Sequence, residues 1–134
     1  MLVAVRSRGG RVVLPNNATN VSTDFIGTNS LDSSLAGTLN GRTKIKTLRF
    51  QAAGSTVDNL IKVYRKDGSG NKTLVLKVFV PSNTPNVSEK RPVWTATFKN
   101  LDIMLFSTSH VLSYQLHVVP GSEIIIDEEA IDYE

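Results

Sequence analysis

Apolar and polar residues alternate along much of the chain after residue 43. In Asn59–Lys66, Ile61 and Val63 fall on one side and Lys62 and Tyr64 on the other. This two-residue period is typical of a β-strand with one buried face. The turn residues Asp-Gly-Ser-Gly-Asn follow at 67–71, and a second apolar strand, TLVLKVFV, begins at residue 73. Residues 59–80 are therefore predicted to form a hairpin.

A strand is also predicted over Thr43–Ala53, where the alternation is interrupted. Ile45 and Leu48 are both apolar, but they are three positions apart, with two residues between them. A regular strand would place these two side chains on opposite faces. The slip therefore predicts a β-bulge between Ile45 and Leu48.

Further strands are predicted over Val93–Phe98, Val111–Val119 and Glu123–Asp127, with an exposed loop before the first of them, at 81–92. The short apolar stretch Leu101–Phe106 fits either a strand end or a single helical turn. Short strands separated by Gly, Pro and Asn, with no convincing helix, predict an all-β chain, an antiparallel β-sandwich or jelly roll. The core expected between its sheets comprises Ile61, Val63, Leu74, Leu76, Val78, Leu112, Leu116 and Val118.

The first forty residues differ from the rest, being rich in Gly, Ser, Thr and Asn with few apolar anchors. They predict an extended N-terminal arm, or a long loop with two short strands, over residues 1–40, preceding a β-sandwich domain over residues 41–134. The arm is expected to reach onto another subunit or to lie over the surface.

Length and composition limit the remaining possibilities. A chain of 134 residues suits one domain, and no apolar run approaches the ~18 residues of a membrane-spanning helix. The N-terminus lacks the features of a signal peptide. With no cysteine there is no disulfide, thiol nucleophile or thiolate zinc site, and a reducing cytoplasm is the favoured compartment.

Charge is distributed unevenly between the two ends of the chain. Residues 1–50 carry seven basic side chains and two acidic ones, whereas the last twelve residues carry six acids and no base. The two ends are expected to attract each other, within one subunit or between neighbours; the alternative is two solvated segments. The candidate subunit-interface residues are Arg6, Arg8, Arg11, Asp127, Glu128, Glu129 and Asp132.

The sequence offers little support for catalysis or for metal binding. His110 and His117 are the only histidines, and neither lies in a recognisable catalytic motif. The acids at 127–132 lack the spacing of a calcium loop. We therefore expect no catalytic residue, no metal site and no cofactor.

Two other classes of ligand remain as alternatives. Lys44, Lys46 and Arg49 form a basic stripe that is compatible with nucleic acid, but no stacking aromatic residue accompanies it, so nucleic acid is not the expected partner. A carbohydrate-binding module would need exposed aromatic side chains. Trp94, Tyr64 and Phe98 are candidates for that role, although Trp94 lies in an apolar strand.

Several short motifs resemble those of small virion proteins of tailed bacteriophages. They are Lys44-Ile45, Leu48-Arg49-Phe50-Gln51-Ala52, the Asp67-Gly68 turn, Val78-Phe-Val80-Pro81, Thr84 and Asp132-Tyr133. The resemblance covers about two-thirds of the chain, from Lys44 to Tyr133.

The resemblance implies a non-enzymatic β-sandwich that decorates the head shell, or else forms part of the tail, the connector or a head-fibre base. The expected partners are the major capsid protein or other virion subunits and further copies of the chain, a trimer being the expected oligomer. No membrane is expected as a partner. The expected location is the virion, assembled in the host cytoplasm.

Overall fold

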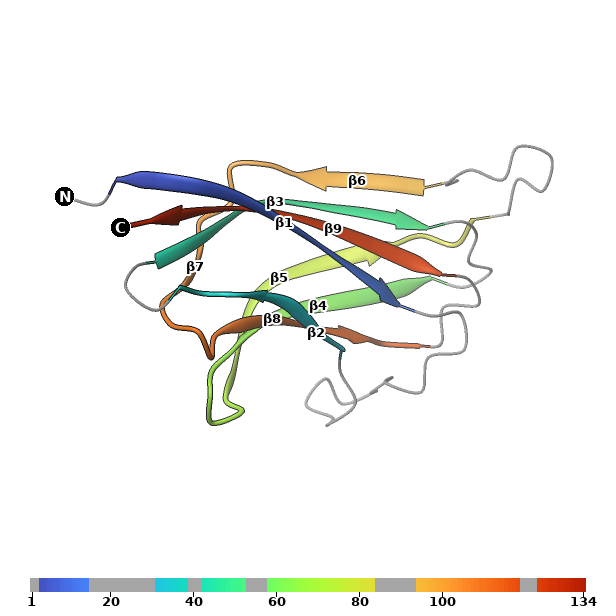
Figure 1. Ribbon diagram of the computed structural model, residues 1–134. Coiled ribbons are helices and arrows are strands. Elements are labelled where there is room, and N and C mark those ends of the chain that lie inside the picture. Colours follow the sequence, from blue (N-terminus) through green and yellow to red (C-terminus); the bar gives the residue numbers. More distant parts are fainter. Residues whose placement is uncertain (1–2, 15–30, 39–41, 53–57, 84–93, 119–122) are drawn as a thin grey trace.

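A computed structural model describes residues 3–14, 31–38, 42–52, 58–83, 94–118 and 123–134, and it is all-β within them (Figure 1). No helix occurs in these ranges, hence none that could cross a membrane. The expected fold class is confirmed. The strands are β1 (Ala4–Leu14), β2 (Leu31–Ala36), β3 (Arg42–Ala52), β4 (Asn59–Lys66), β5 (Lys72–Val80), β6 (Trp94–Phe98), β7 (Ile103–Leu105), β8 (Val111–Leu116) and β9 (Ile124–Tyr133).

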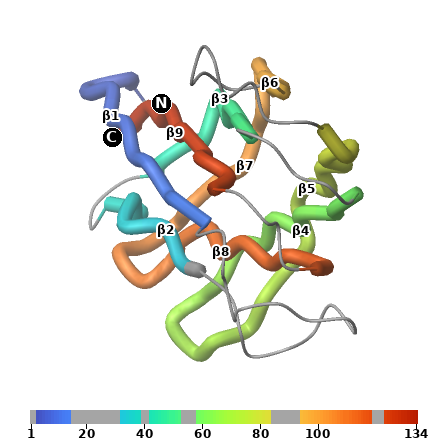
Figure 2. Tube along the Cα trace, turned by 90° about the vertical axis from the view of Figure 1, so that its right-hand side faces the viewer, coloured from blue at the N-terminus to red at the C-terminus, as the bar shows by residue number. Residues whose placement is uncertain are grey.

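The strands form two antiparallel sheets packed face to face. The first sheet has the order β1-β9-β3-β6, and β7 also pairs with β3, whereas the second has the order β2-β8-β4-β5. Viewed from the side in Figure 2, the edge strands β1 and β2 lie on one side of the sandwich, and β5 and β6 lie on the other. The second sheet contains the predicted hairpin, because β4 and β5 pair along their length around the turn at 67–71.

The predicted bulge in β3 is confirmed. The register between β3 and β9 shifts between Ile45 and Thr47, which leaves Lys46 as the extra residue. The Lys46 carbonyl accepts a hydrogen bond of 2.9 Å from the Leu101 amide, at the point where the chain passes from β6 to β7. The bulge therefore lets Ile45 and Leu48 both face the core.

The core lies between the sheets and agrees with most of the expected residues. Ile61, Val63, Val78, Leu112 and Leu116 are buried. Leu76 and Val118 are only partly buried. The other large contributors, which both sheets supply, are Leu14, Ile45, Leu48, Phe50, Leu105, Tyr114, Ile124 and Ile126.

Leu74, expected in the core, is exposed. The register between β4 and β5 shifts at this point, since Val63 faces Leu76 whereas Tyr64 faces Leu74. The extra residue, Val75, reverses the facing of everything before it in β5. Leu74 thus falls on the outer face of the second sheet.

The structure also differs from expectation at the N-terminal end. Residues 4–14 form the edge strand of the first sheet and residues 31–36 that of the second, so the sandwich includes both stretches and begins well before residue 41. The inward positions in the first half of β1 are Arg6, Arg8 and Gly10, which is why no apolar alternation marked this strand. The part of the predicted arm at 15–30 and most of the predicted loop at 81–92 lie outside the described residues.

The last strand is longer than predicted. Instead of ending at Asp127, β9 continues to Tyr133 and lies between β1 and β3. Its inward positions are Ile124, Ile126, Glu128, Ala130 and Asp132. Two of those five positions hold acids, so the alternation of buried and exposed positions does not appear as an alternation of apolar and polar residues.

Candidate functional site

The charged residues of the two chain ends lie on neighbouring strands. β1 and β9 pair from Leu14–Ile124 to Ala4–Tyr133, and Val3 and Glu134 exchange two backbone hydrogen bonds beyond that. The basic and acidic ends therefore attract each other within one subunit, one of the two expected arrangements. Six of the seven candidate interface residues contact partners in their own chain, and Glu129 is exposed on the outer face.

Asp132 is the centre of the first charged cluster. Its carboxylate is buried and accepts hydrogen bonds from Arg6 Nε at 2.8 Å, from Arg8 Nη2 at 2.9 Å and from Thr43 Oγ1 at 2.7 Å. Arg8 also donates to the Ala36 carbonyl at 2.6 Å. Burial alone would raise the pKa of Asp132, but the hydrogen bonds from Thr43, Arg6 and Arg8 outweigh it and hold that pKa below its usual value.

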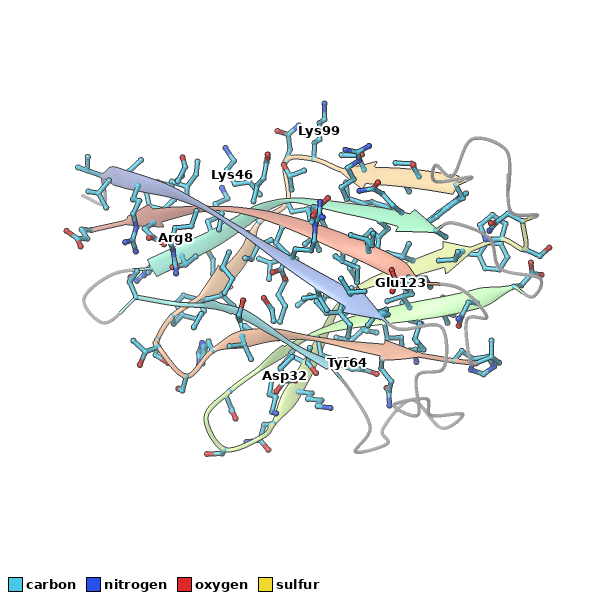
Figure 3. The ribbon with its side chains drawn as sticks, turned by 45° about the vertical axis from the view of Figure 1, so that its right-hand side comes forward. Arg8, Asp32, Lys46, Tyr64, Lys99 and Glu123 are labelled. Atoms are coloured by element: carbon cyan, nitrogen blue, oxygen red, sulfur yellow. The ribbon has the colours of Figure 1, made fainter. Side chains whose placement is uncertain are left out.

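This cluster connects the two sheets at one end of the sandwich. Arg8 reaches from β1, in the first sheet, to Ala36 at the end of β2, in the second. In Figure 3, Arg8 lies on the side of the first sheet that faces the second, whereas Lys46 and Lys99 project from the opposite, outer side. Arg8 is therefore a structural cation, held in place by Asp132.

Glu128 forms the second polar cluster, deeper between the sheets. Its two oxygens accept hydrogen bonds from Ser33 Oγ at 2.5 Å and from Tyr114 Oη at 2.6 Å. Burial raises the pKa of Glu128, the two hydrogen bonds oppose that rise, and the negative charge of Asp127 adds to it. Burial and the neighbouring Glu128 carboxyl likewise raise the pKa of Tyr114 well above its usual value.

Sequence reasoning did not identify Ser33, Thr43 or Tyr114 as partners of the acids. Of these three residues, only Tyr114 could have been identified from the sequence. A tyrosine on the apolar face of a strand needs a hydrogen-bond partner for its hydroxyl. Ser33 and Thr43 lie in stretches where polar residues are frequent, so nothing distinguishes them in the sequence.

Arg11 and Asp127 form an exposed pair on the outer face of the first sheet. Arg11 Nε donates to Asp127 Oδ1 at 2.7 Å, and Gln51 Nε2 donates to Asp127 Oδ2 at 3.0 Å. The hydrogen bond to Asp127 and the charge of Asp127 raise the pKa of Arg11. The pair is solvated and joins β1, β9 and β3 across the sheet.

Exposed apolar side chains mark two sheet edges. On and beside β1, Val3, Val5 and Val13 are 57%, 53% and 42% exposed, and on β5, Leu74 and Phe79 are 41% and 58% exposed. Phe106 is 46% exposed, but the guanidinium groups of Arg42 and Arg65 lie 5.6 and 5.4 Å from its ring centre. Within the described part of the chain, large exposed apolar side chains without such a cover therefore gather at β1 and β5.

The outer face of the β4–β5 hairpin carries these apolar side chains among cations. Cross-strand neighbours there are Leu60 with Phe79, Lys62 with Lys77, and Tyr64 with Leu74. Partial burial and the neighbouring charge of Lys77 lower the pKa of Lys62. This hairpin face is thus apolar and positively charged.

The other residues considered for chemistry are dispersed. His110 Nδ1 accepts a hydrogen bond from the Phe106 amide at 3.1 Å, within a turn of its own. Trp94 and Phe98 pack against the core, so they do not form an aromatic platform with Tyr64. Among the residues that the structure describes, no three His, Asp or Glu side chains gather closely enough to hold a metal ion.

Two viral proteins are among the solved structures that align with this chain, both at low identity and low TM-score. No protein-family model and no curated protein matches the chain. A decameric BFDV capsid protein aligns over 99% of this chain and 98% of its own, at 9% identity and a TM-score of 0.32. A structure of infectious bursal disease virus, Gx strain, aligns over 98% of this chain at 12% identity and a TM-score of 0.32; the chain spans 37% of that protein.

Proposed function

We propose that this chain is a non-enzymatic structural subunit of a virion, which decorates and stabilises an assembled capsid shell. The observation that carries the proposal is the distribution of exposed apolar side chains. Among the described residues, and apart from the cation-covered Phe106, they lie on or beside β1 and β5, which are edge strands of the two sheets as the structure describes them. An edge strand has backbone groups that can pair with another chain. An exposed apolar edge strand is a surface for adding another protein strand.

The internal use of the charged residues supports the same interpretation. Arg6, Arg8 and Asp132 hold the two sheets together, and Glu128 is bound by Ser33 and Tyr114. These groups serve the rigidity of the sandwich. A rigid sandwich whose edge strands can bind other proteins suits a subunit with a structural role.

The β4–β5 hairpin face is the proposed contact with the shell. Leu74 and Phe79 supply apolar area, and Lys62 and Lys77 favour an acidic patch on the partner. The sequence resemblance to bacteriophage virion proteins supports the major capsid protein as the proposed partner. A tail or connector location is the alternative within the virion.

Co-sedimentation tests this proposal. Shells assembled from the major capsid protein of the same genome should bind the chain to saturation, and the bound chain should raise the temperature at which the shells break. The double variant Leu74→Ser/Phe79→Ser should fold normally and bind weakly. Thr73→Ala, an exposed change on the same strand, is the matched control. Binding to isolated tails and not to shells would move the chain to the tail, and binding to neither would overturn a virion role.

A further inference from the structure

We propose that β1 pairs with β1 of a second copy, antiparallel and about a two-fold axis at Gly9, so that the first sheet continues through a dimer. This inference deepens the proposed assembly function by naming a partner for one of the two edges. It rests on the position of the exposed valines, the length of the edge strand and the direction of its charges.

The exposed valines of β1 are symmetrically placed. Val5 and Val13 lie four residues before and four residues after Gly9. In an antiparallel pairing centred on Gly9, Val5 of each copy lies opposite Val13 of the other. Both exposed apolar side chains then gain an apolar neighbour in the same register. Val5 is also available for such a contact, because the β1–β9 register shifts between Ala4 and Arg6 and leaves it without a partner on β9.

The same register uses the whole strand. β1 runs from Ala4 to Leu14, so Gly9 is its central residue. A pairing centred there overlaps all eleven residues, and any other centre overlaps fewer. Backbone groups on the open side of a strand recur every second residue, and a pairing centred on a residue joins positions of like parity, as hydrogen bonding between two such edges requires.

The charges of β1 do not oppose this contact. Edge strands are commonly guarded by charges that repel another strand. Here the guanidinium groups of Arg6 and Arg8 bind Asp132, and that of Arg11 binds Asp127, all within the same subunit. Each cation of this edge is thus held by a carboxylate of its own subunit, and at the centre of the edge Gly9 presents no side chain to the opposing copy.

A two-fold contact of this kind is self-complementary: if a residue of one copy contacts a given residue of the other copy, the reverse contact is also made. It closes after two copies and leaves β5 of each copy open for a different partner. The inferred oligomer is therefore a dimer, in place of the trimer expected from the sequence.

Single-cysteine variants of the full-length protein test the register, because the chain contains no cysteine. Opposed residues in an antiparallel pair have Cα atoms ~4.5–5.5 Å apart, within the range that a disulfide spans. Gly9→Cys should therefore form a disulfide-linked dimer under mild oxidation. A Cβ at Gly9 would meet only the Glu128 carbonyl, at 3.4 Å, so this substitution fits the fold. Ser7→Cys is the matched control and should remain largely unlinked, because in this register Ser7 lies opposite Arg11.

Paired charge substitutions test the valine contacts. Val5→Lys/Val13→Lys places like charges opposite each other twice in the dimer, whereas Val5→Lys/Val13→Glu places opposite charges there twice. Both variants lose the same apolar side chains. By analytical ultracentrifugation the first should dissociate at least about tenfold more readily than the second.

Three results would overturn the β1 pairing: a monomeric wild-type protein, equal dissociation of the two charge variants, or crosslinking of Ser7→Cys as fast as of Gly9→Cys. A monomer that still binds shells would remove this inference and leave the proposed function intact. A β1-linked dimer that binds no virion component would do the reverse.

Discussion

Gly10 lies directly opposite Glu128 in the ladder between β1 and β9, and a Cβ at position 10 would come within 2.7 Å of Glu128 Oε1. The glycine thus makes the space in which the buried carboxyl sits between the two sheets. Gly10→Ala should displace that carboxyl from Ser33 and Tyr114 and lower the free energy of unfolding by about 1–3 kcal/mol. Urea denaturation measures the change.

The neighbouring glycine provides the control for this experiment. A Cβ at Gly9 would make an ordinary contact with the Glu128 carbonyl at 3.4 Å. Gly9→Ala should therefore change stability by no more than about 0.5 kcal/mol. Equal losses for the two alanine variants would show that the space at Gly10 is not reserved for Glu128.

Glu128 should make stability fall as the pH rises. Its pKa is raised in the folded state, chiefly by burial, so the folded protein binds the proton more tightly than the unfolded chain. The contribution of this group is fully present below the unfolded pKa of about 4.3 and is lost as the pH rises through the folded pKa. The free energies of unfolding of the wild type and of Glu128→Gln should be measured from pH 4 upward. The wild-type value should fall relative to that of the variant as the pH rises. A constant difference between them would contradict the raised pKa.

Asp132 should act with the opposite sign. Its pKa is lowered in the folded state, because hydrogen bonds from Thr43, Arg6 and Arg8 outweigh the effect of burial. Its contribution is present above the unfolded pKa of about 3.9 and is lost as the pH falls through the folded pKa. At neutral pH, Asp132→Asn should cost about 1–3 kcal/mol, since Arg8 keeps its charge but loses the carboxylate.

The exposed pair of the outer face is the comparison for Asp132→Asn. Asp127→Asn should leave the free energy of unfolding nearly unchanged, because exposed ion pairs contribute little. A loss as large as that of Asp132→Asn would show that the burial of Asp132 does not set its importance. Asp127, Glu128, Glu129 and Asp132 were expected from the sequence to be interface residues, which would allow them to be neutralised together with the fold intact. The structure corrects this, since Glu128 and Asp132 are buried.

The bulge in β5 predicts a contrast between two leucines of the second sheet. Leu116→Ala removes a fully buried side chain and should cost about 2–5 kcal/mol. Leu74→Ala removes an exposed one and should cost no more than about 0.5 kcal/mol. Thermal or chemical denaturation of both variants checks the assignment. A large loss of unfolding free energy for Leu74→Ala would show that the Leu74 side chain lies in the core, as β5 without its bulge would place it.

The parts of the fold that the sequence predicted are those in which apolar side chains face the core. The β4–β5 hairpin and the β3 bulge follow from where Ile61, Val63, Ile45 and Leu48 fall. β1 and the second half of β9 were not predicted because their inward positions hold polar or small residues instead of apolar ones. The inward residues of one strand are complementary to those of the other. Arg8 satisfies Asp132, and Gly10 accommodates Glu128. The sequence of either strand alone does not indicate which of its residues face the core. The complementarity becomes clear only when the two strands are paired.

The position of β9 between β1 and β3 also bears on the order in which the chain folds. β4 and β5 are joined by a short turn and can pair early, whereas β9 must close long loops before it contacts either neighbour. β1 has no partner in the first sheet until β9 is in place. Folding should therefore be slow for a domain of this length, and the pairing of β1 with β9 should be among its last steps.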